Sequence, residues 1–271
     1  MQILVVGATG VLGRQVVPRL VERGHSVRAV VRRPEAAHAL AAAGVELAAG
    51  DILDAGSLLL AAAGCDVALH LATAIPKPGG NWSRNDRIRR EGTRNLLAAA
   101  AAHGVRRYVQ QSIAMLYGDT GQTVADESAP LQPGPVIQSA ADMEQMVRAA
   151  ALDWCILRGG LFYGAGAGLE EEWRQAAGAH TLQLPGDGRD LISLIHVVDM
   201  ARAVLLAAEG ARRGSVYNVV DDEPAHYADL LAYVAAQAGA PPPQAGGPRR
   251  LASFACSNAR IKRDLGWQPA Y

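Results

Sequence analysis

The chain has 271 residues, and its 26 Lys and Arg balance its 26 Asp and Glu, so its formal net charge is zero. At roughly 100–200 residues per domain, this length predicts one large domain or one domain with a small appendage. The neutral balance disfavours nucleic acid as a partner, because nucleic-acid-binding proteins normally present a basic face. No apolar run approaches the roughly 18 residues of a membrane helix, and the start lacks a signal-peptide pattern. We therefore expect a cytoplasmic protein with no membrane partner.

The three cysteines, Cys65, Cys155 and Cys256, are odd in number and widely spaced. This spacing fits reduced thiols better than a disulfide framework or a zinc site. We therefore expect no bound metal.

The first part of the chain alternates short β-branched runs with amphipathic stretches. Strands are predicted at Ile3–Val6, Val27–Val31, Val45–Ala48, Val67–Leu71, Tyr108–Gln111 and Trp154–Leu157. Helices are predicted at Val11–Glu22, Ala36–Ala43, Ser57–Ala63, Arg87–His103 and Ser139–Ala150. Buried strands joined by helical crossovers form a parallel, doubly wound α/β sheet, which binds its ligand at the carboxyl ends of the strands.

After Leu157 the alternation loosens. Gly159–Gly168 and Pro185–Arg189 are glycine-rich loops, and residues 239–248 are rich in proline and glycine. The remaining predicted elements are helices at Val197–Ala208, Tyr227–Ala238 and Ser257–Asp264 and a strand at Val216–Val219. We expect residues 159–271 to form a small substrate-facing lobe, with some of its elements returning to the sheet.

A glycine-rich turn, Gly7-Ala8-Thr9-Gly10-Val11-Leu12-Gly13, follows the first strand and opens a helix. Gly7 permits the tight turn, Gly10 lets backbone amides approach a pyrophosphate, and Gly13 lets the helix lie close to the sheet. The positive end of the helix dipole then faces the phosphates. Residues 1–158 are therefore predicted to form a dinucleotide-binding domain. The residues of this turn expected to contact the cofactor are Gly7, Thr9, Gly10, Val11, Leu12 and Gly13.

The end of the second strand reads Val30-Val31-Arg32-Arg33, where an NAD-binding protein usually carries an acid. An acid repels a 2′-phosphate, whereas arginine pairs with one, so we expect NADP(H) held by Arg32 and Arg33. The alternative is that both arginines are simply solvated on a loop. Asp51, after the third strand, is expected either to accept a bond from the adenine amino group or to act as a turn residue.

These motifs, together with several further along, resemble the extended short-chain dehydrogenase/reductases, the NAD-dependent epimerase/dehydratase group. The further motifs are Gly50–Asp54, His70–Thr73, Leu116–Gly118, Leu157–Gly159, Gly186–Gly188, His196–Asp199, Tyr217–Val219 and Leu265–Trp267. The resemblance covers nearly the whole chain and implies a Rossmann domain with a small C-terminal substrate lobe. It also implies cofactor contacts from Ile52, Leu71, Ala72, Thr73 and Arg158. Members of this group often pair through the helices at 87–103 and 139–150, so the chain is expected to be a monomer or a homodimer.

The catalytic positions depart from the group. The resemblance implies a Tyr-x-x-x-Lys pair, in which tyrosine exchanges the carbonyl proton and lysine lowers the tyrosine pKa and holds the nicotinamide ribose. In this chain Val136 stands at the tyrosine position and Ala140 at the lysine position, while Pro135, Ser139 and Glu144 stay in register. The chain has only two lysines, Lys77 and Lys262, and neither lies near this motif.

The serine position is also displaced. Counting back from Tyr117 puts the catalytic hydroxyl at Ile113, one residue after Ser112. A shift of one residue on a strand turns the side chain to the other face. We name Ser112 as the candidate catalytic residue, acting if the strand end bends. His196 is interpreted as a structural histidine bonded to Asp199 or to backbone, with an acid role as the alternative.

Hydride transfer without the usual proton donor of the protein suits an aromatic ketone whose own hydroxyl stabilises the developing alkoxide. We therefore expect an NADPH-dependent, substrate-assisted ketoreductase with an apolar site. In lacking the tyrosine, the lysine and the serine at these positions, the chain weakly resembles the ketoreductases of angucyclinone-type aromatic polyketides. This resemblance implies a role in antibiotic biosynthesis. One alternative is an NADP(H)-binding sensor of the NmrA-like type, which the run 27–33 resembles; another is a non-redox epimerase or dehydratase. The candidate walls of the substrate pocket are Met115, Leu161, Phe162, Tyr163 and Trp173.

Overall fold

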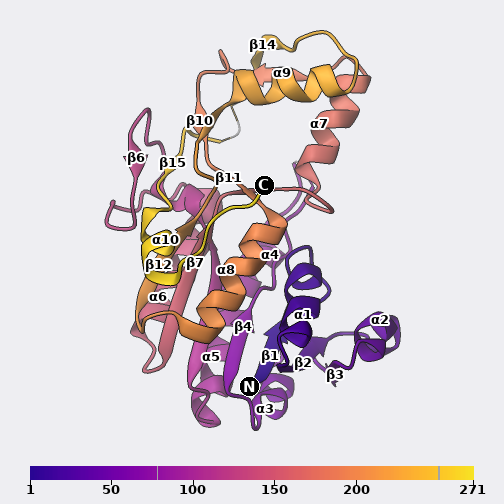
Figure 1. Cartoon of the computed structure of the whole chain (residues 1–271), viewed down its shortest axis with the longest axis vertical. Helices are drawn as coiled ribbons and strands as arrows, with labels where there is room; N and C mark the ends of the chain where they lie inside the picture. The colour runs from indigo at the N-terminus through magenta and orange to yellow at the C-terminus, as the bar shows by residue number, and fades with distance from the viewer. Residues whose placement is uncertain (78, 250) are drawn as a thin grey trace.

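A computed structural model describes residues 1–77, 79–249 and 251–271. Its centre is a seven-stranded sheet in the order β12-β7-β5-β4-β1-β2-β3, and every neighbouring pair is parallel (Figure 1). The seven strands are β1 (Gln2–Val6), β2 (Ser26–Val31), β3 (Glu46–Ala49), β4 (Val67–His70), β5 (Arg107–Ile113), β7 (Asp153–Gly159) and β12 (Ser215–Val219). The predicted doubly wound Rossmann sheet is confirmed, because all seven predicted strands occur within two residues of their expected bounds.

Helices cover both faces of the sheet, as a doubly wound fold requires. One face packs against α1 (Gly13–Glu22), α2 (His38–Ala42) and α8 (Val197–Gly210), through a core that includes Val16, Leu20 and Val204. The other face packs against α3 (Ala55–Ala62), α5 (Thr93–Ala102) and α6 (Gln138–Ala149), through a core that includes Leu58, Leu96 and Val147. Short 3₁₀ turns lie at η1 (Pro34–Ala36), η3 (Ala114–Tyr117) and η4 (Pro135–Ile137).

The helix predicted at Arg87–His103 is longer than expected and not uniform. It begins as α4 (Ser83–Arg87), passes through a π-helical turn, η2 (Ile88–Gly92), and continues as α5. Single π turns within α-helices are rare and often accompany functional sites. Hydrophobic spacing alone does not distinguish such a turn from regular helix.

The lobe lies at one end of the molecule and contains one helix that the sequence analysis missed (Figure 1). This helix, α7 (Leu169–Gly178), carries Glu170, Glu171 and Glu172 in its first turn, which suits the positive end of the helix dipole. The other helix of the lobe is α9 (Tyr227–Gln237), whereas α10 (Ala259–Leu265) packs against β12 and α8. The short strands of this part of the chain are β8 (Leu161–Tyr163), β9 (Gln183–Pro185), β10 (Leu191–Ile192), β11 (Leu194–His196), β13 (Ala225–His226), β14 (Gln244–Gly247) and β15 (Ala255–Cys256), and β15 pairs with β6 (Val124–Ala125).

Several segments after residue 158 return to the main sheet. The strand β12 pairs with β7 as the last strand of the sheet, and α8 packs into the same core as α1. Trp267 is buried in that core, and its Nε1 donates to the backbone oxygen of Asp199 at 3.0 Å. The motifs His196–Asp199 and Leu265–Trp267 are therefore joined directly in the fold.

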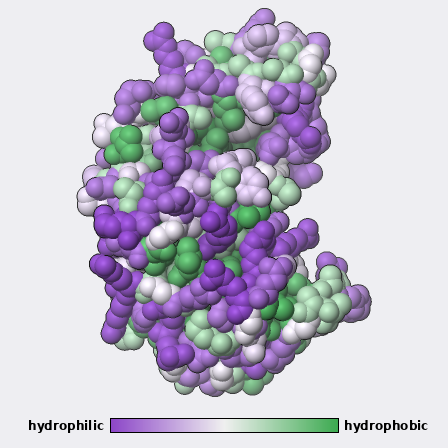
Figure 2. All heavy atoms as spheres, in the orientation of Figure 1, coloured by the Kyte–Doolittle hydropathy of each residue, from purple (hydrophilic) through white to green (hydrophobic). Residues whose placement is uncertain are grey.

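The surface and the cysteines add little to the search for a site. Figure 2 shows a mostly hydrophilic face with hydrophobic patches near its middle, below the lobe. Over the described residues, no helix has the length and hydrophobicity needed to cross a bilayer. The three cysteines are buried free thiols.

Candidate functional site

The glycine turn lies at the point where the strand order of the sheet reverses. From β1 the chain builds β2 and β3 on one side and β4, β5 and β7 on the other, which opens a crevice between the ends of β1 and β4. Gly7 has a φ of +100°, and a Cβ there would lie 2.6 Å from the backbone nitrogen of Ala72. The predicted residues Gly7, Leu71 and Ala72 thus meet at the switch point, and Thr73 follows them on the surface.

The turn also brings helix α1 very close to β1. A Cβ on Gly13 would lie only 2.1 Å from the backbone oxygen of Gly7, so a larger residue is excluded unless the backbone moves. Among the described residues, the amide groups of Val11 and Leu12 donate no hydrogen bond. Free amides at a helix N-terminus fit the phosphates of a dinucleotide. The residues of this turn therefore fit the pyrophosphate of an NAD(P)-type dinucleotide.

The side chains at the expected adenosine end are exposed and poorly constrained. Arg32 and Arg33 are both exposed, and within the described chain neither forms an ion pair. Asp51 accepts a bond from the Leu53 amide at 3.0 Å and lies 3.7 Å from an Arg84 nitrogen. The bond from the Leu53 amide to Asp51 is typical of a turn residue. The predicted contact of Asp51 with the adenine stays a prediction. Ile52 is buried against Gly92 of the π turn.

The three positions at which the sequence analysis expects apolar residues in place of a serine, a tyrosine and a lysine lie in two distinct environments. Val136 lies in η4 and is 56% exposed, whereas Ala140 lies in the first turn of α6 and is fully buried. Ile113 ends β5 in an extended conformation and is half-buried. None of these three side chains can donate or accept a proton.

Ser112 belongs to a buried polar network. Its hydroxyl donates to Glu144 Oε1 at 2.7 Å, and the residue is 2% exposed. The same carboxylate receives two bonds from Arg158, at 2.9 and 2.6 Å, so the network links β5, α6 and β7. The structure places Ser112 and Arg158 together but gives both of them protein partners. Their predicted catalytic and cofactor roles remain predictions.

The network extends to the ends of β7 and β12. Arg158 Nη1 donates to the Tyr117 hydroxyl at 2.8 Å, and that hydroxyl donates to Asn218 Oδ1 at 2.7 Å. Burial raises the pKa of Tyr117 to about 12, although the neighbouring Arg158 opposes this shift. At neutral pH the Tyr117 phenol therefore keeps its proton.

His196 lies among aromatic rings rather than on Asp199. Its ring stacks on Tyr271 at 3.9 Å between centroids and meets Tyr163 edge-on at 5.1 Å. Asp199 instead accepts bonds from Arg202 and from the backbone amides of the last two residues. His196 Nδ1 is buried without a hydrogen-bond partner among the described residues, so the predicted bond of this ring to Asp199 or to backbone is not found there. Burial lowers the pKa of His196, which favours its neutral form.

Sequence reasoning missed an acid beside this aromatic cluster. Asp221 lies two residues beyond the buried end of β12, and its Oδ1 is buried with no hydrogen-bond partner among the described residues. Burial raises the pKa of Asp221 to about 6. Burial and the nearby Asp221 raise the pKa of Tyr163 above its usual range. The signal available in the sequence was an acid at the carboxyl end of a predicted strand.

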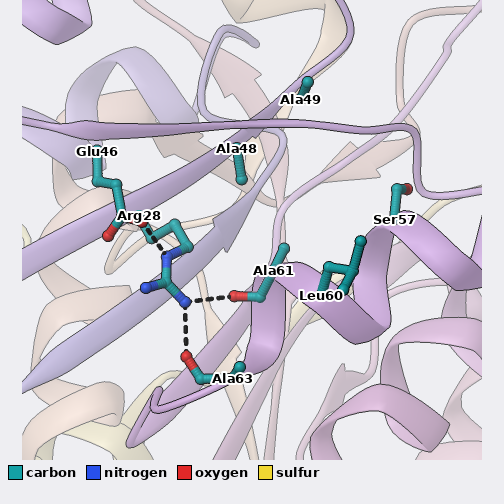
Figure 3. A pocket seen from close by; sticks show the side chains of 8 residues that line it. All are labelled: Arg28, Glu46, Ala48, Ala49, Ser57, Leu60, Ala61 and Ala63. Atoms are coloured by element: carbon teal, nitrogen blue, oxygen red, sulfur yellow. Dashed lines mark hydrogen bonds and ion pairs between the residues drawn. The ribbon is translucent and has the colours of Figure 1, made fainter.

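Two hollows lie away from the glycine turn. The first, of about 300 Å³, lies between β2, β3 and α3, where Arg28 donates to the Ala61 and Ala63 carbonyls at 2.8 and 2.6 Å (Figure 3). Glu46 accepts from Arg28 at 2.7 Å, so this arginine caps the end of α3 and its charge is already paired. The second hollow, of about 410 Å³, lies between α5 and α6, the helices through which pairing is predicted. The predicted homodimer remains a prediction.

Comparisons with known proteins agree with this geometry. Residues 7–183 match the model of a family described as NAD(P)H-binding. A Streptomyces protein named 3-diazoavenalumate denitrifying reductase is 37% identical, over 100% of this chain and 97% of its own length. A ketoreductase from Stigmatella aurantiaca, named for a 4-hydroxy-2-methyl-3-oxo-4-farnesyl-3,4-dihydroquinoline-1-oxide, is 31% identical over 85% of this chain and 71% of that protein. A crystal structure of a short-chain dehydrogenase/reductase superfamily protein from Agrobacterium tumefaciens, with NAD bound, has a TM-score of 0.83 and 27% identity over 100% of this chain and 93% of that one.

Proposed function

This chain belongs to the NAD(P)H-binding family, and we propose that it delivers a hydride to an acceptor that needs no proton from the protein. It is an NAD(P)H-dependent oxidoreductase with the fold of the extended short-chain dehydrogenase/reductases and with reductases among its relatives. One observation carries the proposal: Val136 and Ala140 occupy the positions of the usual tyrosine and lysine. A missing general acid typically costs about 10²–10⁴-fold in rate, unless the reaction does not require one.

An arenediazonium ion is an acceptor of this kind. NAD(P)H, when bound, supplies a hydride. The hydride forms a new C–H bond, the C–N bond breaks, and its electron pair leaves with dinitrogen, so no proton is taken up or released. The diazo compound and the loss of nitrogen in the name of the Streptomyces relative support this class for the present chain. The apolar side chains at 113, 136 and 140 suit it, because none of these three side chains can protonate the substrate.

A hydroxyaryl ketone is the second candidate acceptor, and the ketoreductase relative from Stigmatella supports it. Here the carbonyl carbon receives hydride, and the substrate's own neighbouring hydroxyl gives its proton to the new alkoxide. An aromatic polyketide of the angucyclinone type contains such a group, which connects this candidate to antibiotic biosynthesis. In both candidates the protein supplies position and an apolar surrounding rather than an acid.

We propose NADP(H) as the cofactor, because Arg32 and Arg33 are exposed at the end of β2 and free to pair with a 2′-phosphate. Replacing Arg32 with Glu should weaken NADPH binding much more than NADH binding. A control change at the other end of β2, Arg23→Glu, removes a pairing with Glu209 instead and should change neither affinity. Equal losses for both cofactors in Arg32→Glu would refute the 2′-phosphate assignment.

The function is tested with purified protein, NADPH and two panels, hydroxyarenediazonium ions and hydroxyaryl ketones. NADPH deuterated at its hydride-donating carbon should place deuterium on the carbon that lost nitrogen or on the former carbonyl carbon. Reactions without protein correct for direct reduction of the diazonium ion. If neither panel is reduced faster than in those blanks, the chain is better described as an NADP(H) sensor.

A further inference from the structure

A buried arginine lies close to Ala140, the position at which related enzymes carry a lysine. Arg89 is in the π turn between α4 and α5, and it is only 5% exposed. Over the described residues its one hydrogen bond is long: Nη1 donates to the Ser139 hydroxyl at 3.3 Å. No carboxylate in the described chain lies within ion-pair distance of it. A buried cation without a close counter-ion is costly, so a group outside the described chain is expected to complete its bonds.

The nearest acid is already engaged. Asp86 accepts a bond from Ser139 at 2.6 Å, so the serine hydroxyl separates the carboxylate from the guanidinium. Burial lowers the pKa of Arg89 to about 10, with the neighbouring Arg90 acting in the same direction and Asp86 opposing it. The guanidinium therefore stays protonated at neutral pH and offers donors that the protein does not use.

Arg89 lies on a helix whose start packs against the segment that borders the cofactor crevice. One turn earlier on the same helix, Asn85 is fully buried, and its Oδ1 accepts the Ala74 amide at 2.9 Å. This bond fixes the helix start against the segment that follows β4, where the switch point lies. Asn85 Nδ2 is a second buried donor without a partner among the described residues. Ser139, the contact of Arg89, immediately precedes Ala140 in α6.

We propose that Arg89 binds the hydroxyl groups of the nicotinamide ribose. The lysine of related enzymes has two tasks, lowering the tyrosine pKa and holding this ribose, and Val136 removes the first task. Ala140 is small and buried, and the Arg89 guanidinium on the facing helix contacts Ser139, the residue next to it. Its planar set of donors matches two adjacent hydroxyl oxygens. This inference rests on the proposed use of NAD(P)H, although it does not depend on which substrate is reduced.

The test measures equilibrium binding to the full-length protein without any substrate. Arg89→Met should raise the Kd for NADPH by about 10- to 100-fold, the loss expected for hydrogen bonds to a charged group. Binding of 2′-phospho-AMP, which lacks the nicotinamide ribose, should stay unchanged. Arg89→Lys keeps a cationic donor and should retain most of the affinity, and it serves as a second variant if the methionine variant does not fold.

Arg90→Met is the matched control. Arg90 is the next residue on the same helix, but it is partly exposed and pairs with Asp142 at 2.7 Å. Its loss should leave both affinities unchanged. The proposal is overturned if Arg89→Met binds NADPH normally, or if it loses NADPH and 2′-phospho-AMP equally. A wild-type protein that binds NADPH but reduces neither panel would refute the proposed function while leaving the Arg89 assignment intact.

Discussion

Glu144 and Arg158 form a two-bond ion pair inside the molecule, with Nε–Oε1 at 2.9 Å and Nη2–Oε2 at 2.6 Å. Both side chains are 1% exposed, so water cannot replace either partner. The pair fastens helix α6 to strand β7 next to the candidate site. Because α6 also carries Ser139 and Ala140, this pair helps to set where the first turn of α6 lies.

Replacing Glu144 with Gln should therefore destabilise the protein strongly. It leaves a buried guanidinium without its counter-ion, and such changes typically cost about 3–5 kcal/mol in the free energy of unfolding. Denaturant unfolding measures this loss. The matched control is Glu91→Gln, which breaks the exposed pair with Arg87 and should cost less than about 1 kcal/mol. Similar losses in the two variants would show that the buried pair does little for stability.

Replacing Ser112 with Ala separates a structural from a catalytic role. The change removes the bond to Glu144 Oε1, which still accepts from Arg158, so we expect a loss of about 1–3 kcal/mol in stability. With a substrate that needs no protein acid, kcat should change less than about threefold, well below the loss typical of a missing acid. The two measurements are thermal unfolding and single-turnover hydride transfer. A loss of about 100-fold or more in hydride transfer, with stability unchanged, would establish Ser112 as the acid.

Replacing Gly13 with Ala should disrupt the cofactor turn. The added methyl group would lie 2.1 Å from the Gly7 oxygen and 2.7 Å from Ala8, so the start of α1 has to move. We expect NADPH affinity to fall by at least about tenfold, since the amides that face the phosphates move with the helix. The control is Gly134→Ala, where a Cβ meets nothing within 4 Å and no left-handed φ is needed. Unchanged NADPH affinity in Gly13→Ala would argue against this turn as the phosphate site.

His70 should make stability depend on pH. Burial lowers its pKa from 6.5 to about 4, so the folded protein holds a neutral ring where the unfolded chain is protonated. The unfolded chain binds more protons between these two values, so stability should rise as the pH increases from about 4 to 6.5, by at most about 3.4 kcal/mol. Urea unfolding at several pH values measures the slope. His70→Asn should flatten this part of the profile, whereas the surface variant His103→Asn should keep it.

The sheet could be predicted because most of its strands are short, largely buried runs rich in Ile, Val and Leu, although β3 (ELAA) is not buried. The order of the predicted strands then placed the glycine turn after the first strand and Arg32 at the end of the second. Helix α7 was missed because it follows a glycine-rich run, and its stability depends on packing Trp173 against Tyr227 in the lobe. The two-residue strands were missed because such short pairings arise from the surrounding fold rather than from a local pattern.

Side-chain pairing was the harder part of the site. The sequence kept Glu144 in register with related enzymes, but nothing local indicates that Arg158, fourteen residues later, shares its carboxylate with Ser112. Arg89 was hidden inside a helix with several arginines, most of which are exposed. Only burial separates it from Arg87 and Arg90, and burial depends on how helices α5 and α6 pack.

The position of β12 at the edge of the sheet has a consequence for how the protein folds. Strand β7 is complete at Gly159, but its outer neighbour β12 begins only at Ser215, after α7 and α8. During synthesis the edge of β7 therefore stays open while some fifty residues are added, and open strand edges invite pairing with other chains. A fragment ending near residue 158 should aggregate rather than bind a dinucleotide. The sheet therefore stays incomplete at this edge until the residues between β7 and β12 have been synthesised.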